Sequence, residues 1–120
     1  MTIEQIWQCA IRVLDQHKAE DIRVLKVSGV TSIADYFLLA SGGSANQVRS
    51  LADYAEEALA KEGKHPLRTE GYSSGEWITL DYGDVLLHLF RRETRDFYDL
   101  ERLWVDATQM DVTPYYYFEQ

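Results

Sequence analysis

Four side chains in this sequence could together perform metal-assisted chemistry. Asp81 and Asp84 flank a tight turn, and His88 follows them in the apolar run Val85–Phe90. With Asp53 from further upstream they would give a divalent metal carboxylate and imidazole ligands, as a phosphotransferase or nuclease requires. A histidine inside an apolar run is more often a core residue hydrogen-bonded to a neighbour. We therefore keep a metal-dependent enzyme only as the alternative hypothesis.

A glycine-rich loop, Ser41-Gly42-Gly43-Ser44, could bind an anion because it leads into a helix N-terminus. It lacks the spacing of dinucleotide-binding loops and the lysine of a Walker loop. The loop is also similar to the Gly-Ser entry of nucleotidyltransferases, which hold Mg²⁺ with two carboxylates one residue apart. Here Asp53 is followed by Tyr54 and Ala55, so the second carboxylate is missing. We predict a structural turn, no metal, no cofactor and no enzymatic activity.

The single cysteine, Cys9, excludes an internal disulfide and lies within a helical pattern, where we expect it to pack. The composition is that of a protein of the reducing cytoplasm. No apolar run approaches the roughly 20 residues of a membrane-spanning helix, and the N-terminus has neither signal-peptide nor transit-peptide character. We expect a cytoplasmic protein that does not bind membranes.

Charge is distributed unevenly along the chain. The net charge is −8; residues 1–69 carry nine acids and eight bases, whereas residues 70–120 carry eleven acids and four bases. Nucleic-acid binding depends on Lys and Arg that neutralise phosphates, so direct nucleic-acid readout is not expected. A basic protein surface is the better electrostatic partner.

The hydrophobic periods predict one α/β domain with a mixed sheet of about five strands flanked by helices. Capping boxes begin at Thr2 and Ser44, and Gly83 provides the turn of a hairpin. The predicted elements are a helix from Ile3 to about His17–Ala19, strands at Ile22–Val27 and Tyr36–Ala40, a helix from Ser44 to Gly63, strands at Leu67–Glu70, Trp77–Leu80 and Val85–Phe90, and a short helix or helical turn within Thr94–Trp104.

The strand that begins at Trp77 suggests a docking surface. Its alternation places Ile78 and Leu80 on one face and Trp77, Thr79 and Asp81 on the other. If Ile78 and Leu80 face the core, Trp77 faces either solvent or a covering segment. Exposed Trp and Tyr rings are typical of interface hot spots, and acids beside them would suit a basic partner. A second set at helical spacing could dock the last helix on the sheet or extend this patch: Phe97, Leu100 and Trp104.

Several motifs occur together in a specific order from Ile3 to Ala107. They are Ala34-Asp35-Tyr36-Phe37, Ser41-Gly42, Asn46-Gln47-Val48, Glu70-Gly71, Trp77, Leu80-Asp81-Tyr82-Gly83-Asp84-Val85, His88 and Arg95-Asp96-Phe97-Tyr98-Asp99-Leu100-Glu101-Arg102-Leu103-Trp104. In combination they resemble the ribosomal silencing factor family RsfS, also called the Iojap family. The resemblance implies a nucleotidyltransferase-like topology without nucleotidyltransferase activity.

The resemblance also implies a function. Such a protein binds the large ribosomal subunit through its fourteenth protein, sterically blocks association with the small subunit and represses translation when nutrients are limiting. Carried over by position, the expected partner-binding residues are Trp77, Thr79, Asp81, Tyr82, Tyr98, Asp99 and Glu101.

The resemblance divides the chain into a domain over residues 1–107 and a C-terminal tail over residues 108–120. The tail contains Pro114 and three consecutive tyrosines but no core-forming period, so we expect it to pack loosely or to stay mobile. The aromatic surface leaves homodimerisation open.

Overall fold

A mixed sheet forms the centre of the protein. The computed structural model describes residues 1–119, and six strands lie in the order β3-β4-β5-β2-β1-β6. β2 and β5 are parallel, whereas the other neighbouring strands are antiparallel. The elements are α1 (Ile3–Gln16), β1 (Glu20–Lys26), β2 (Tyr36–Gly42), α2 (Ala45–Ala60), β3 (Arg68–Glu70), β4 (Trp77–Asp81), β5 (Val85–Arg91), α3 (Arg92–Tyr98), α4 (Leu100–Leu103), β6 (Thr108–Gln109) and a 3-10 turn, η1 (Thr113–Tyr115).

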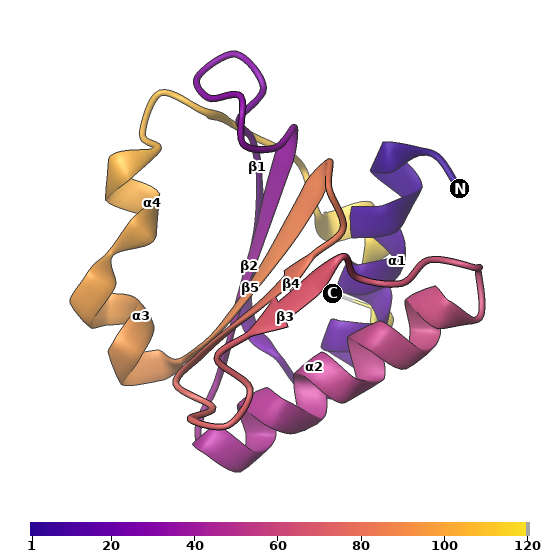
Figure 1. The fold of residues 1–120 in the computed structure, drawn as a ribbon, viewed down its shortest axis with the longest axis vertical. Helices are drawn as coiled ribbons and strands as arrows, with labels where there is room; N and C mark the ends of the chain where they lie inside the picture. The colour runs from indigo at the N-terminus through magenta and orange to yellow at the C-terminus, as the bar shows by residue number, and fades with distance from the viewer. Residues whose placement is uncertain (120) are drawn as a thin grey trace.

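Helices cover both faces of this sheet (Figure 1). α1 and α2 lie on one face, where the larger hydrophobic core forms. α3 and α4 lie on the other face, over a smaller core that includes Phe37, Leu86 and Phe90. Every residue of β2 is buried, which confirms the prediction of a strand covered on both sides.

Side-chain caps determine where the two long helices begin. The Thr2 hydroxyl accepts a hydrogen bond from the Gln5 amide at 3.1 Å, and the Gln5 side chain accepts one from the Thr2 amide at 2.8 Å. Ser44 caps α2 in the same way, accepting from the Gln47 amide at 3.1 Å. The Gln47 side chain instead accepts from the Gly43 amide. The capping box predicted at Ser44 is therefore only half formed, and the glycine-rich loop is a turn closed by these two side-chain hydrogen bonds.

The predicted hairpin joins β4 to β5. Gly83 has a φ of 85°, in the left-handed region that glycine tolerates without steric cost. The Asp81 carboxylate accepts a hydrogen bond from the Gly83 amide at 2.8 Å. The Asp84 carbonyl accepts from the backbone amides of Asp35 and Tyr36, which ties the turn to the start of β2.

The helical segment before Trp104 differs from the sequence-based expectation. It consists of two short helices, α3 and α4, which are separated at Asp99. Asp99 has a φ of 49°, so the backbone cannot continue as one right-handed helix through this residue. The two pieces therefore meet at an angle and follow the sheet (Figure 1).

The sheet has one strand more than the expected number of about five. Thr108–Gln109 pairs antiparallel with Leu25 and Lys26 of β1 and forms the edge strand β6. This strand lies in the segment predicted as a tail. Two residues are too short for the period-2 pattern that identifies strands in a sequence.

The C-terminal segment continues along α1. The Tyr115 ring packs edge-on against Trp7, with ring centroids 5.5 Å apart, and its hydroxyl accepts a hydrogen bond from Gln8 at 3.2 Å. The Arg12 guanidinium lies 5.1 Å from the centre of the Tyr117 ring. These contacts join the segment to the domain, and the division at Ala107 stays a prediction. Within residues 1–119, no helix has the length and apolarity needed to span a bilayer.

Candidate partner-binding site

The alternation predicted for β4 is confirmed. Ile78 and Leu80 are fully buried in the larger core, whereas Trp77, Thr79 and Asp81 are half-buried on the opposite face. Trp77 is partly covered: its ring stacks on Phe90 with centroids 4.8 Å apart. A partly covered ring has both a fixed position and an accessible edge.

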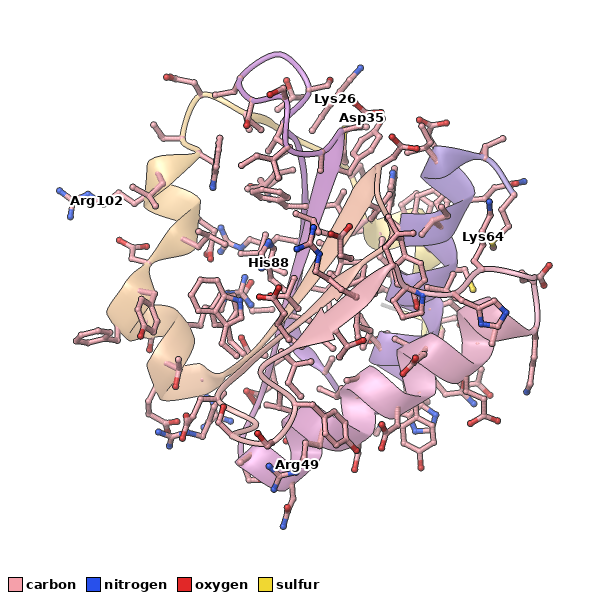
Figure 2. All side chains as sticks on the ribbon, viewed as in Figure 1. Lys26, Asp35, Arg49, Lys64, His88 and Arg102 are labelled. Carbon is pink, nitrogen blue, oxygen red and sulfur yellow. The ribbon has the colours of Figure 1, made fainter. Side chains whose placement is uncertain are left out.

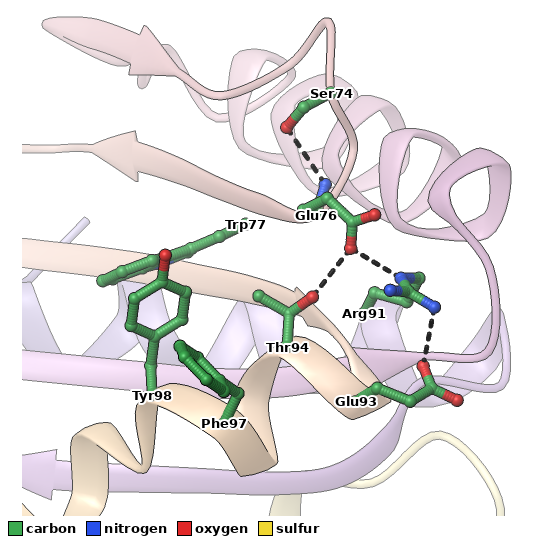
Figure 3. A pocket seen from close by; sticks show the side chains of 8 residues that line it. All are labelled: Ser74, Glu76, Trp77, Arg91, Glu93, Thr94, Phe97 and Tyr98. Atoms are coloured by element: carbon green, nitrogen blue, oxygen red, sulfur yellow. Dashed lines mark hydrogen bonds and ion pairs between the residues drawn. The ribbon is translucent and has the colours of Figure 1, made fainter.

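A groove lies between β4 and α3, and Trp77 lines it (Figure 3). We call this feature the β4–α3 groove. Its volume is about 470 Å³. Its walls combine aromatic rings with charged side chains from both elements and from the adjoining segments. The lining residues are Ser74, Glu76, Trp77, Arg91, Glu93, Thr94, Phe97 and Tyr98.

Two rings of α3 form the outer wall of the groove. Phe97 is 81% exposed and Tyr98 is 54% exposed. Tyr98 lies beside Trp77, with ring centroids 5.1 Å apart, and Phe97 packs edge-on against Tyr98. Two neighbouring exposed aromatic side chains beside a third form a surface suited to protein docking.

The three apolar side chains at helical spacing, Phe97, Leu100 and Trp104, divide between the two predicted roles. Leu100 and Trp104 pack against the smaller core and dock the helical segment on the sheet. Phe97 instead projects into solvent at the groove (Figure 3). The break at Asp99 changes the helix phase between these positions, so sequence spacing alone could not separate them.

A hydrogen-bonded polar cluster forms the other wall. The Glu76 carboxylate accepts hydrogen bonds from Arg91 and from the Thr94 hydroxyl, and Arg91 also donates to Glu93 at 3.1 Å. The hydrogen bond from Arg91, followed by that from Thr94, lowers the pKa of Glu76. These residues were not predicted from the sequence, because their proximity arises only when β4, β5 and α3 come together.

His88 lies beneath Trp77, at the centre of the molecule in Figure 2. The Trp77 indole N–H donates to His88 Nδ1 at 3.1 Å, and the Phe37 ring meets the imidazole edge-on at 4.9 Å. His88 is only 7% exposed, and burial lowers its pKa to about 4. The prediction of a core histidine hydrogen-bonded to a neighbour is confirmed.

Asp81 and Thr79 continue the same sheet face away from the groove. The Asp81 carboxylate forms an ion pair with Arg68 of β3 at 3.3 Å, in addition to its bond within the hairpin. Thr79 lies opposite Glu70 of β3 and His88 of β5. Asp81 is therefore partly neutralised, and this end of the face carries charges of both signs.

The structure places Tyr82 on the other side of the sheet. Its side chain packs against the larger core, and burial raises the pKa of its phenol. Strand alternation itself puts position 82 with Ile78 and Leu80. Of the seven expected contact residues, Tyr82 is thus separated from Trp77 by the sheet.

Glu101 and Asp99 have different surroundings, although both were expected to contact a partner. Glu101 accepts a hydrogen bond at 3.2 Å from Arg95, which is 4% exposed. Arg95 also donates to the Ser41 hydroxyl at 2.8 Å and to the Asp21 carbonyl at 2.7 Å. Glu101 therefore helps to attach α3 and α4 to the sheet, whereas Asp99 is exposed between them.

The residues of the alternative metal site do not come together. Asp53 lies on α2, where its carboxylate accepts a hydrogen bond from the Tyr72 hydroxyl at 3.0 Å. His88 lies on the opposite sheet face, against Trp77. Among the described residues, no three His, Cys, Asp or Glu side chains are grouped as a metal site would require.

Comparisons with known proteins point to one family. Over residues 1–119 the chain matches the family RsfS, described as "Ribosomal silencing factor during starvation". It is 35% identical over 112 residues to ribosomal silencing factor RsfS of Halalkalibacterium halodurans, covering 93% of this chain and 96% of that protein. It is 33% identical over 101 residues to a Mus musculus protein named "Mitochondrial assembly of ribosomal large subunit protein 1", covering 78% of this chain and 42% of that protein.

Solved structures show the same fold. A crystal structure of a Chromobacterium violaceum protein is similar with a TM-score of 0.85 and 38% sequence identity, and the match covers 88% of each chain. The predicted α/β class is therefore confirmed.

Proposed function

This chain belongs to the RsfS family of ribosomal silencing factors, and from this premise we propose that it represses translation by occupying the large ribosomal subunit. In this proposal it binds the fourteenth protein of that subunit and sterically prevents the small subunit from joining. It acts in the cytoplasm when nutrients are limiting. The family description names a regulator, and the proposed mechanism makes and breaks no covalent bond.

The observation that carries the proposal is the β4–α3 groove. Trp77, Phe97 and Tyr98 present three rings on one surface, two of them largely exposed. Monomeric proteins rarely leave such rings together in solvent without a partner. The name of the mouse relative links that protein to the large ribosomal subunit, which supports the choice of partner.

The negative charge of the chain indicates a basic partner. The chain carries a net charge of −8, with most of the excess acid after residue 70. Ribosomal proteins are commonly basic, so a basic protein surface beside rRNA complements this face whereas bare RNA repels it. Asp99 and the carboxylates at the groove would orient the encounter, and the rings would supply most of the affinity.

Sedimentation with purified ribosomal subunits tests this function. We expect the protein to travel with the large subunit through a gradient and to reduce the amount of joined ribosomes. Trp77→Ala should weaken binding by about 2 kcal/mol, or roughly 30-fold, because it removes a central ring. Tyr54→Ala is the matched control, since Tyr54 is a 41% exposed ring on α2, away from the groove.

Two results would contradict the proposal. If the ribosomal subunits join normally in an excess of the protein, steric occlusion is not its mechanism. Equal affinity of Trp77→Ala and the wild type for the large subunit would remove the β4–α3 groove as the binding site.

A further inference from the structure

We propose that His88 is the positioning residue for Trp77, holding the indole in the orientation that a partner contacts in the β4–α3 groove. The inference rests on the proposed function of this groove. His88 lies beneath the groove and does not line it. Its effect on a partner would therefore pass through Trp77.

The strand register brings the two side chains together. Thr79 lies opposite His88 and Trp77 lies opposite Phe90 in the β4–β5 pair. Trp77 and His88 are thus diagonal neighbours on one sheet face, at a distance that long side chains can bridge. The indole N–H donates to His88 Nδ1 at 3.1 Å.

Three contacts together fix the indole. Phe90 supports its face with an interplanar angle of 26°, and Tyr98 lies against it at 5.1 Å. These aromatic contacts hold the plane of the ring but do not determine which edge of the indole points inward. The hydrogen bond to His88 is directional and selects one rotamer. A ring that is already ordered loses less conformational entropy when a partner binds.

His88 is itself held rigidly. It is 7% exposed and meets the Phe37 ring edge-on, with an interplanar angle of 80°. Burial keeps the imidazole neutral at neutral pH. Because Nδ1 accepts a hydrogen bond, the ring proton resides on Nε2. His88 therefore offers Trp77 one acceptor in a fixed place.

The histidine at this position carries a stability cost beside its hydrogen bond to Trp77. Nε2 is buried and has no hydrogen-bond partner among the described residues. A buried donor without a partner is unfavourable, and an apolar side chain of similar volume would avoid it. The property that a leucine lacks is the Nδ1 acceptor. Departures from the most stable local choice are concentrated at functional positions.

The first arm of the test is spectroscopic and needs no partner. The chain has three tryptophans, so an NMR spectrum contains three indole N–H signals, and Trp77→Phe identifies that of Trp77. In His88→Leu we expect this signal to shift and its hydrogen exchange to accelerate. His88→Asn should restore slow exchange, because Asn Oδ1 occupies nearly the position of Nδ1. The Trp7 signal, from the larger core across the sheet, is the internal reference.

The second arm measures affinity for the purified large subunit. We expect His88→Leu to bind about threefold to tenfold more weakly, through loss of the ordered ring. His88→Asn should stay within about twofold of the wild type. Leu89→Val is the matched control: it removes buried volume from the same strand, but on the larger-core side. Its affinity should equal that of the wild type, although its stability is lower.

The outcomes distinguish this inference from the proposed function. If Trp77→Ala weakens binding while His88→Leu binds normally, the positioning role is wrong and the groove remains the site. If His88→Asn fails as severely as His88→Leu while both are folded, the acceptor is not the cause. If Trp77→Ala binds normally, the proposed site itself is wrong.

Discussion

At the residue scale, His88 makes folding sensitive to acid. Burial lowers its pKa to about 4 in the folded protein, whereas an unfolded histidine titrates near 6.5. Between these values the unfolded chain binds a proton that the folded protein does not bind, so stability falls as the pH is lowered. The contribution of neutral His88 to the free energy of unfolding is fully present above about pH 6.5 and is lost progressively as the pH falls to about 4.

This pH dependence can be measured by chemical denaturation. Between pH 7 and pH 5 we expect the wild type to lose about 2 kcal/mol of its free energy of unfolding through this group. His88→Leu should remove most of that loss. His17→Gln should keep it, because the loss comes from the burial of His88, whereas His17 is only partly buried and stacks on Tyr54 of α2. An equally steep pH dependence in His88→Leu would contradict the assignment.

At the element scale, Arg95 attaches α3 and α4 to the sheet. Its guanidinium contacts Ser41 of β2, the Asp21 carbonyl of β1 and Glu101 of α4. Replacement by Met leaves these acceptors without their buried donor, and we expect a loss of about 3 kcal/mol. Because the groove wall belongs to α3, Arg95→Met should also accelerate backbone hydrogen exchange in α3 and α4 and weaken partner binding.

A neighbouring arginine is the control for this prediction. Arg92 forms a bidentate pair with Glu20 at the surface, with 51% of its side chain exposed. Arg92→Ala should change the free energy of unfolding by less than about 1 kcal/mol. Similar exchange rates in α3 and α4 for both variants would show that Arg95 is not the main attachment.

The elements that could be predicted from the sequence are those with local causes. The caps at Thr2 and Ser44 and the turn at Gly83 depend on residues within three or four positions. The break at Asp99 and the two-residue strand β6 depend on packing against distant strands, which periodicity does not report. The break at Asp99 gives two short helices where one helical segment was expected, and β6 gives a strand where a tail was expected.

The candidate site was predictable to a similar extent. Alternation along β4 placed Trp77 correctly on the face away from the larger core. The same alternation places Tyr82 on the opposite face, against the larger core. The family resemblance had instead suggested Tyr82 as a partner-binding residue. Glu76, Arg91 and Thr94 were missed as groove residues, because separate segments of the chain must meet before they share a surface.

At the scale of the whole molecule, the net charge of −8 should determine how quickly the protein finds its partner. Attraction to a basic ribosomal surface accelerates association, and salt screens it. We expect the association rate constant to fall as salt rises from about 0.05 M to about 0.3 M, with a smaller change in dissociation. Trp77→Ala should mainly accelerate dissociation. Association that does not respond to salt would contradict electrostatic steering.

The route of the C-terminal segment has a practical consequence for such kinetic experiments. Tyr115 and Tyr117 hold this segment on α1, and the sheet separates α1 from α3 (Figure 1). A biotin or fluorescent label introduced just after Tyr117 would therefore lie on the α1 side of the sheet, opposite the β4–α3 groove. Protein immobilised on a sensor chip through that label would present Trp77 to the flowing ribosomal subunits.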